Sequence, residues 1–273
     1  MSLTVRFWGV RGSIPTPQAE NLAFGGNTAC LEVRLGDDPP LIFDAGTGAR
    51  RLGLRLANAE PGRVRFFLTH FHWDHIQGLP FFGPNYLAGW ELDFHAAGSA
   101  HATSNLLRSQ MARPCFPAAS AVAARLRYHQ IAPTGLQAGE VAVTPFPLHH
   151  PGGATGYRIQ ASGASIVYAS DHEHGDPAGD SALRRAAEGA DVLIYDAQYT
   201  PEEYERRRGW GHSTWLEATR AARDAGVGRL VLFHHDPERD DVALERIVQA
   251  AQREFRNTTA AREGETITLP ERA

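Results

Sequence analysis

The chain has 273 residues, of which 42% are hydrophobic and 21% charged, as in an ordinary globular protein with a hydrophobic core. Its formal net charge of −4 gives no general attraction for nucleic acid or other polyanions. No stretch approaches the roughly 18 apolar residues of a membrane span, and no secretory signal opens the chain. We therefore expect no membrane contact and a cytoplasmic location.

The first half of the chain is predicted to consist of strands separated by glycine-rich turns. Alternating or wholly apolar runs of strand length predict strands at 3–10, 29–35, 41–44 and 64–69. Residues 49–58 have helical spacing. The last of these strands ends at His70.

Between residues 76 and 130 the pattern is less regular. A strand is expected at 93–97, followed by a helix at 100–112 that ends before Pro114. We expect the segment 100–117 to cover the functional site as a lid.

The second half has helices between its later strands. Strands are predicted at 141–148, 155–161, 164–170, 191–196, 229–234 and 265–269, and helices at 180–189, 213–225 and 240–255. Two halves, each with strands first and helices later, favour two sheets packed face to face with helices outside. Because no linker or low-complexity segment divides the chain, we expect one domain over residues 1–273.

The strongest functional signal is the segment His-Phe-His-Trp-Asp-His at residues 70–75. In an extended segment His70, His72 and Asp74 point to the same side, because side chains alternate with a period of two. If a helix begins near Asp74, its turn brings His75 toward the same point. Nitrogen and oxygen ligands gathered at the end of one strand are what a metal site needs. The segment therefore predicts metal binding.

Six residues cannot complete two coordination spheres, so further ligands are expected where other strands end. The candidates that follow predicted strands are His149 or His150, Asp171, and His234 or His235. Polar residues commonly end strands, but three such positions make coincidence less plausible. The choice within each histidine pair stays open at this point.

Imidazole and carboxylate ligands suit Zn²⁺ and also Mn²⁺ or Fe²⁺. The only two cysteines, Cys30 and Cys115, are far from the cluster in sequence, so no thiolate narrows the choice of metal. Their spacing gives no disulfide framework either, and we expect both thiols to be reduced.

The order of these residues resembles that of the metallo-β-lactamase superfamily over nearly the whole chain. Within it, Gly211-His-Ser-Thr214 followed by Leu230-Val-Leu-Phe-His234 is similar to the tRNA 3′-processing endonucleases (RNase Z). That branch also holds a cyclic ribose phosphodiesterase of phosphonate breakdown. The opening Gly9-Val-Arg-Gly-Ser-Ile-Pro15 and Gly25-Gly-Asn-Thr-Ala29 are similar to bacterial phosphodiesterase-like members. The resemblance implies an α/β fold, the four-layer αββα sandwich.

Carried over position by position, the resemblance implies two divalent metal ions. One would be bound by His70, His72 and His150, the other by Asp74, His75 and His234, with Asp171 bridging them. His150 is preferred because the family's ligand directly precedes a Pro-Gly-Gly turn, and His234 because the family's ligand ends the Leu-Val-Leu run. His235 would then support the ligands or face the substrate.

The resemblance also implies the chemistry. Two ions about 4 Å apart would share a hydroxide that attacks phosphorus. Asp196 matches an acidic residue, Glu in the endonucleases, that orients the motif histidine, so His212 is the expected general acid. Asp74 would bind a metal and also orient the hydroxide. Asp44 would support the histidines of the first ion.

Two departures from the endonucleases favour a small substrate. They continue after the late histidine with Ser and an Arg-Tyr pair, whereas His235-Asp-Pro237 follows here, and their long tRNA-gripping arm has no counterpart. We therefore expect a phosphodiesterase for a small phosphodiester such as a cyclic nucleotide. The alternatives are a carboxylic ester, lactone or thioester hydrolase with the same metals, or an RNase Z-like ribonuclease. Members of this branch are often dimers, so a homodimer is expected.

Weaker candidates surround the cluster. Four aromatic residues follow or lie within the cluster: Trp73, Phe81, Phe82 and Tyr86. Their side chains could stack on a nucleobase or form a packed core beneath the site. Arg11 and Arg113 are candidate phosphate contacts.

Overall fold

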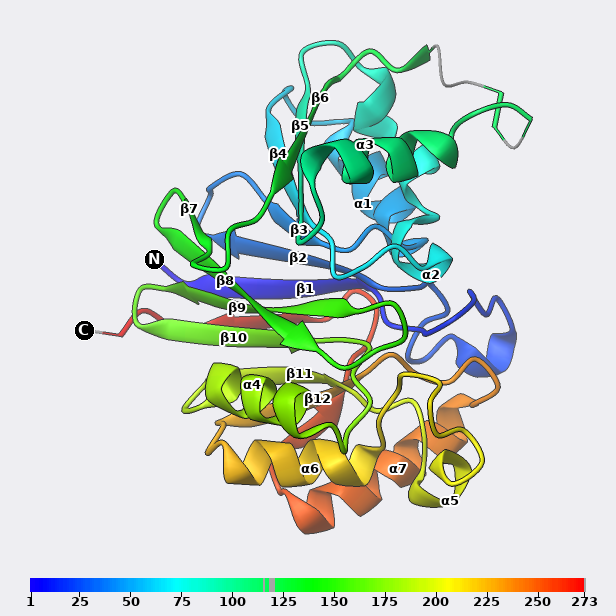
Figure 1. Ribbon diagram of the computed structural model, residues 1–273, viewed down its shortest axis with the longest axis vertical. Helices are drawn as coiled ribbons and strands as arrows, with labels where there is room; N and C mark the ends of the chain where they lie inside the picture. Colours follow the sequence, from blue (N-terminus) through cyan, green and yellow to red (C-terminus); the bar gives the residue numbers. More distant parts are fainter. Residues whose placement is uncertain (115, 118–120, 273) are drawn as a thin grey trace.

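Two seven-stranded sheets pack face to face in the part of the chain that the computed structural model describes, residues 1–114, 116–117 and 121–272 (Figure 1). The first sheet consists, in order across it, of β14 (Thr266–Leu269), β1 (Leu3–Gly9), β2 (Cys30–Leu35), β3 (Leu41–Phe43), β4 (Arg63–Phe67), β5 (Glu91–Ala96) and β6 (Arg125–Gln130). The second consists of β13 (Thr258–Ala260), β12 (Arg229–Phe233), β11 (Val192–Asp196), β10 (Ala164–Ala169), β9 (Ala154–Ala161), β8 (Val141–Leu148) and β7 (Leu136–Ala138).

Both sheets follow the same plan. Strands β14 to β3 and strands β7 to β10 pair antiparallel, whereas β3 to β6 and β10 to β13 pair parallel. Parallel strands end at the same edge of a sheet, and in open α/β sheets ligands bind outside those carboxyl ends.

Helices cover the outer face of each sheet, so that the two sheets lie between two sets of helices (Figure 1). The first sheet carries α1 (Gly48–Leu56) and α3 (Ala100–Ser109), and the second carries α4 (Pro177–Ala187), α6 (Trp215–Asp224) and α7 (Asp241–Glu254). The short elements are α2 (Trp73–Ile76), α5 (Pro201–Tyr204), η1 (Ala19–Asn21), η2 (Leu79–Phe81) and η3 (Gly83–Tyr86). The layers confirm the predicted αββα sandwich.

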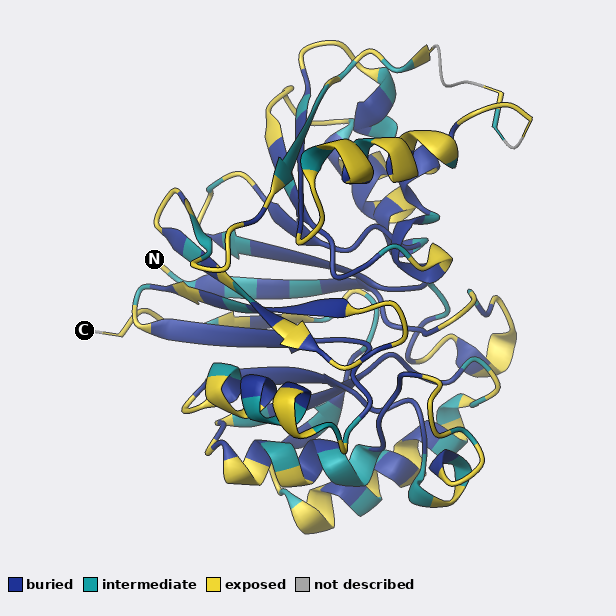
Figure 2. Cartoon of the chain, in the orientation of Figure 1, coloured by how far each residue is buried: buried dark blue, intermediate teal, exposed yellow. Residues whose placement is uncertain are grey.

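Apolar side chains fill the interfaces between the layers. Between the sheets, the ring of Phe43 packs edge-on against Tyr157 and Tyr168, and Tyr168 packs against Phe233. A further apolar cluster lies between each sheet and the helices that cover it. The outward faces of these helices are exposed (Figure 2). Each fully buried aromatic or aliphatic side chain contributes about 1.5–3 kcal/mol, so these interfaces hold the strand ends in place.

Most predicted elements are present, with ends that shift by a few residues. α4 begins earlier than predicted, because the Asp176 carboxylate accepts a hydrogen bond from Gly179 N and Pro177 suits the first helical position. The sequence does not predict β6, β7 or β13. β7 and β13 have only three residues each, and β6 is an edge strand in which polar side chains interrupt any apolar run.

The helix α3 belongs to the helix layer and does not form a lid. Its Leu107 is buried against the outer face of the first sheet, together with Leu92 and Phe94. The prediction of a lid is therefore wrong for this helix. Cys30 is a free, buried thiol, as predicted, whereas Cys115 lies outside the described residues.

Among the described residues, no helix combines the length and the apolar character that crossing a bilayer requires.

Candidate metal centre

The predicted site residues gather at one end of the sandwich, on turns that follow strands. Asp44, Asp171 and His234 lie just beyond β3, β10 and β12, with φ angles of 60°, 60° and 59°. Residues other than glycine rarely adopt this left-handed backbone conformation, which costs about 1–3 kcal/mol. Ser13, with a φ of 64°, lies at the same end of the molecule. Strained backbone concentrated at one place indicates a functional site.

Three imidazoles and one carboxylate oxygen form a first group of metal-binding atoms. His72 Nδ1 lies 3.1 Å from His150 Nε2. Asp171 Oδ2 lies 3.6 Å from His70 Nε2 and 3.7 Å from His150 Nε2. Only His72 of these four residues is exposed, so solvent reaches the group from its side.

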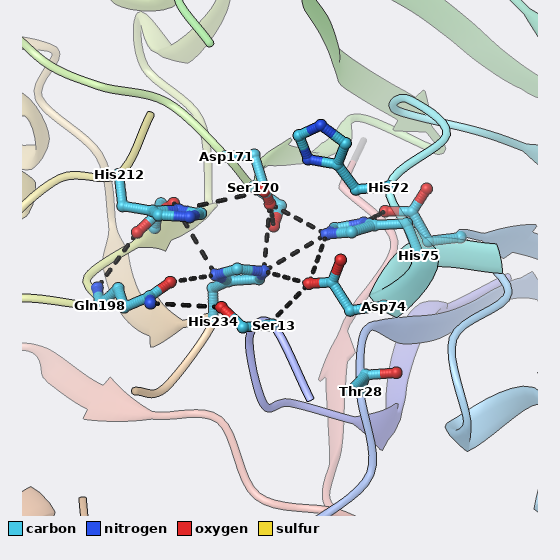
Figure 3. Close-up of polar contacts among 12 residues, drawn as sticks. Ser13, Thr28, His72, Asp74, His75, Ser170, Asp171, Gln198, His212 and His234 are labelled. Atoms are coloured by element: carbon cyan, nitrogen blue, oxygen red, sulfur yellow. Dashed lines mark hydrogen bonds and ion pairs between the residues drawn. The ribbon is translucent and has the colours of Figure 1, made fainter. Parts of the chain in front are cut away.

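A second group consists of Asp74 and His75 from α2 and of His234 (Figure 3). His234 Nε2 lies 3.3 Å from His75 Nε2 and 3.1 Å from Asp74 Oδ2. The other oxygen of Asp171, Oδ1, lies 3.1 Å from His75 Nε2 and 3.3 Å from His234 Nε2. Asp171 therefore turns one oxygen to each group, as a carboxylate that bridges two cations does.

The spacing of these atoms fits metal coordination. Nitrogen and oxygen ligands lie about 2.0–2.2 Å from zinc, so neighbouring corners of a tetrahedron are about 3.3–3.6 Å apart. The shortest and longest of the separations above are 3.1 and 3.7 Å. In addition, the buried Nε2 of His70 has no hydrogen-bond partner among the described residues. A cation in each group would satisfy these atoms.

Four of the imidazoles are held from behind by a hydrogen bond at the other ring nitrogen. The contacts are His75 Nδ1 with Asp44 Oδ2 at 2.8 Å, His234 Nδ1 with Gln198 Oε1 at 2.9 Å, His150 Nδ1 with Gly211 O at 2.8 Å, and His70 Nδ1 with Thr69 Oγ1 at 3.0 Å. Where Nδ1 donates the hydrogen bond, Nε2 keeps its lone pair for a metal.

Two glycines of the sequence motifs make room for these rings. A Cβ atom at Gly12 would lie 2.4 Å from His234 Nδ1, and one at Gly211 would lie 2.2 Å from His150 Nδ1. Any side chain there would displace an imidazole. Next to Gly12, the backbone N–H of Ser13 donates a hydrogen bond to Asp74 Oδ2 at 2.8 Å. The motif around Gly12 thus positions members of the second group.

The site contains an excess of buried negative charge. Four carboxylates are buried there without an ion pair to arginine in the described part of the chain: Asp44, Asp74, Asp171 and Asp196. Burial opposes protonation of His75, but Asp171, Asp74 and Asp44 outweigh burial and raise its pKa. Burial lowers the pKa of His70 and His150, which favours the neutral form that binds metals. The site therefore favours added cations.

His212 and Asp196 form a pair that adjoins both groups, against Asp171 and His234, with which they also make up a possible set of metal-binding atoms. His212 Nδ1 lies 2.8 Å from Asp196 Oδ2, and its ring stacks on His234 with centroids 4.9 Å apart. Burial disfavours the imidazolium, but the charge of Asp196 and its hydrogen bond outweigh burial and raise the pKa of His212 to about 9. The imidazolium of His212, held by the Asp196 carboxylate, can donate a proton.

Residues 41–235 match the family model described as Beta-lactamase superfamily domain. The chain belongs to this superfamily.

Relatives in the superfamily cover most of the chain. Ribonuclease BN of Cronobacter sakazakii is 26% identical over 84% of this chain and 89% of its own length. Ribonuclease Z of Haloarcula marismortui is 27% identical over 86% of each protein. An uncharacterized protein of Mycobacterium leprae is 31% identical over 88% of this chain and 82% of its own length. The predicted resemblance to the RNase Z-like branch is confirmed.

Solved structures show the same fold. The metallo-β-lactamase fold protein YhfI from Bacillus subtilis has a TM-score of 0.73 at 21% identity, over 98% of this chain and 100% of that chain. A diphosphatase from the PhnP family has a TM-score of 0.72 at 17% identity, over 98% of each chain. The prediction of a metal-dependent hydrolase of this superfamily is confirmed, and the fold implies divalent metal ions, which the two groups fit.

The structure brings together all the residues that the superfamily resemblance assigns to metal binding. Of the two histidine pairs, His150 and His234 lie in the groups, whereas His149 turns its Nδ1 to Glu173 O at 3.1 Å. The prediction that His235 supports the ligands or faces the substrate is wrong. Its ring is buried, and its Nε2 donates a hydrogen bond to Ala261 O at 2.9 Å.

Asp44 also differs from its predicted place. It was expected beside the histidines of the first group, but it directly contacts His75 of the second. Its link to the first group is indirect, through Thr69 Oγ1, which lies 3.0 Å from Asp44 Oδ1 and 3.0 Å from His70 Nδ1.

Ser13, Thr69 and Gln198 are further site residues that are not among the candidates from the sequence. Ser13 acts through its backbone N–H, and its place in the glycine-rich Gly9–Pro15 motif is the signal that points to it. Thr69 directly precedes His70, and Gln198 follows Asp196 by two residues. For these two, closeness to ligand candidates is the available signal.

The aromatic candidates divide between core and surface. Phe82 is buried against Phe66 with ring centroids 5.2 Å apart, and Tyr86 donates its hydroxyl to Pro80 O, so both belong to the packing beneath the site. Trp73 and Phe81 are 80% and 59% exposed.

Arg11 does not contact substrate, contrary to the prediction. Its side chain is fully buried, and it donates hydrogen bonds to the carbonyl oxygens of Gly25 at 2.9 Å, Asp236 at 3.1 Å and Arg239 at 2.7 Å. The guanidinium therefore ties the N-terminal loop to the segment after β12.

Replacing Arg11 by methionine should lower the free energy of unfolding by about 3 kcal/mol or more, because three carbonyl oxygens lose their donor and each buried, unsatisfied group costs about 1–3 kcal/mol. Urea denaturation measures this change. Arg113→Met, at an exposed position, is the control and should stay within about 0.5 kcal/mol of the wild type. Equal stability of both variants would contradict the structural role of Arg11.

Proposed function

We propose that the chain is a binuclear metal-dependent phosphodiesterase that acts on a small phosphodiester, such as a cyclic nucleotide. The observation that carries this proposal is the Asp171 carboxylate, which turns one oxygen to each of two groups of metal-binding atoms. The pair of His212 and Asp196 beside these groups adds a proton donor.

Two divalent ions fit the residues at this site. His70, His72 and His150 would hold one ion, Asp74, His75 and His234 the other, and Asp171 would contact both. Zinc suits these nitrogen and oxygen ligands, with manganese or iron as alternatives. When bound, the ions would polarise phosphoryl oxygens and lower the pKa of water.

The chain's own residues have separate tasks. The backbone N–H of Ser13 fixes Asp74, which holds its carboxylate toward His75 and His234. The imidazolium of His212 gives its Nε2 proton to the leaving oxygen as the bond from phosphorus to that oxygen breaks. Asp196 orients His212 and stabilises its charged form.

The proton donor favours a phosphodiester over a thioester, and the two adjacent groups of metal-binding atoms favour it over a lactone, because two cations can hold the oxygens of one phosphate between them. An alkoxide is a strongly basic leaving group that requires a proton, and His212 can supply it. A thiolate needs no such help. Ribonuclease is a second candidate, because relatives at 26% and 27% identity are named Ribonuclease BN and Ribonuclease Z.

A substrate panel on one protein sample tests the proposal. We expect elemental analysis to find two divalent ions per chain, and the sample to hydrolyse bis(p-nitrophenyl) phosphate and cyclic nucleotides. A chelator should abolish this activity, and zinc or manganese should restore it. Efficient cleavage of a precursor tRNA, with poor activity on small diesters, would favour the ribonuclease. Activity on lactones or thioesters alone would overturn both.

A cytoplasmic location and a homodimer stay predictions. Light scattering on the purified protein measures the oligomeric state directly.

A further inference from the structure

We infer that a cavity beside the first metal-binding group holds the retained ester group of the substrate, and that this group is uncharged and of aromatic-ring size. The inference rests on the proposed phosphodiesterase function and adds which part of the substrate is recognised, and where.

The cavity adjoins the candidate metal centre directly. Its volume is about 520 Å³, which lies in the range of small-molecule sites. The turn that carries His70 forms one wall, and Gly152 and Gly153, which directly follow His150 and Pro151, form another. The remaining walls come from the ends of β5 and β6, from β8 and from the start of β9. A molecule bound at His70 and His150 can therefore extend into the cavity.

The lining excludes a charged group. No aspartate, glutamate or arginine contributes to it, and His70 is the single titratable side chain among its walls. Two of the polar side chains there are already engaged, since Thr69 Oγ1 lies 3.0 Å from Asp44 Oδ1 and Gln130 Nε2 donates to Ala97 O at 3.1 Å, and Thr155 adds only an uncharged hydroxyl. A phosphate would lose its hydration there without compensation.

The same lining favours an apolar, flat group. Phe71, Ile131 and Phe146 present apolar surface, and prolines extend it. At Gly152 and Gly153 the wall is bare backbone, because both residues have positive φ angles of 83° and no side chain. An aryl ester meets these conditions directly, and a nucleobase meets them as the far end of a retained nucleoside, whereas a second phosphate does not.

The position of His212 decides which ester group enters the cavity. A general acid must lie beside the leaving oxygen. His212 contacts His150 and His234, with ring centroids 5.5 and 4.9 Å away, but it does not line the cavity. The leaving group therefore lies toward His212, and the ester group that stays on phosphorus lies in the cavity.

Two diesters with the same leaving group test the inference. For the wild type, kcat/KM for phenyl p-nitrophenyl phosphate should exceed that for methyl p-nitrophenyl phosphate by at least about 10-fold, since even small apolar groups give such discrimination. Ala97→Trp, at an exposed wall position, should fill the cavity and raise KM for the phenyl ester alone. Pro133→Trp tests the same effect from another exposed wall position. Leu54→Trp adds the same indole on α1, outside the cavity, and should leave kcat and KM for both esters unchanged.

The possible results separate this inference from the proposed function. If neither ester is hydrolysed by the metal-loaded wild type, the phosphodiesterase proposal fails. If both are hydrolysed with equal kcat/KM, or if the two cavity-filling variants lower both rates equally, only the assignment of the cavity is overturned. Loss of the preference for the phenyl ester in Ala97→Trp and Pro133→Trp, with an unchanged kcat/KM for the methyl ester, supports the assignment of the cavity.

Discussion

Replacing Asp171 by asparagine is expected to leave the chain unable to hold two divalent ions and to remove nearly all of its hydrolytic activity. The two carboxylate oxygens of Asp171 lie 3.6 and 3.7 Å from imidazole nitrogens of one group and 3.1 and 3.3 Å from those of the other. Asparagine has the same size, but it would turn an NH2 group, which cannot bind a metal, toward one group. Elemental analysis should find one ion per chain or fewer.

Asp44→Asn is the matched comparison for this variant. Asp44 is buried at the same centre. It contacts Nδ1 of His75, the ring nitrogen that faces away from the metal-binding atoms. Replacing a residue that supports a metal ligand lowers metal affinity or activity by about 10- to 100-fold, which is the decrease expected for Asp44→Asn. The decrease in activity for Asp171→Asn should be larger.

Thermal stability gives an independent measurement for Asp171→Asn. Without metal, the variant loses the negative charge that faces His75. Burial opposes this charge in the wild type, but the attraction to the histidines outweighs burial and lowers the pKa of Asp171, so the variant should melt below the metal-free wild type. Added zinc should raise the melting temperature of the wild type more than that of the variant, because ligand binding stabilises the folded state. A variant that kept two ions and full activity would contradict the bridging role.

The metal-binding groups could be predicted because their geometry is largely local. His70 to His75 span one strand end and one helical turn, and His150, Asp171 and His234 each follow a strand. Strands of a sheet that run parallel end at the same edge, so their end residues converge whatever the strand order. The alternation of strands and helices likewise predicts the layered fold without any knowledge of register.

Contacts that depend on distant segments could not be predicted. Arg11 stands in a glycine-rich loop, where an arginine suggests a phosphate contact. Only the tertiary structure shows that the carbonyls of Asp236 and Arg239 surround its guanidinium. His235 has the same strand-end position as His234, but the backbone turns between them and sends the two rings in different directions.

His212→Ala is expected to slow the hydrolysis of alkyl phosphodiesters by about 10²- to 10⁴-fold and that of nitrophenyl esters far less. An alkoxide needs a proton as its bond to phosphorus breaks, whereas nitrophenolate leaves as a stable anion. His212 is placed for this transfer, because Asp196 holds its Nδ1 at 2.8 Å and Nε2 is then the nitrogen that can donate. With diesters of graded leaving-group acidity, log kcat should fall more steeply with leaving-group basicity for the variant than for the wild type.

Two further variants separate proton donation from a supporting role of His212. Asp196→Asn keeps an acceptor for Nδ1 but removes the charge, so its loss should be smaller and should follow the same dependence on the leaving group. His174→Ala removes a histidine whose Nδ1 contacts Ser213 Oγ at 2.9 Å, outside both metal-binding groups, and should leave all esters unaffected. Metal content must match the wild type in every variant. Equal losses on alkyl and nitrophenyl esters would then mean that His212 holds the site in place and donates no proton.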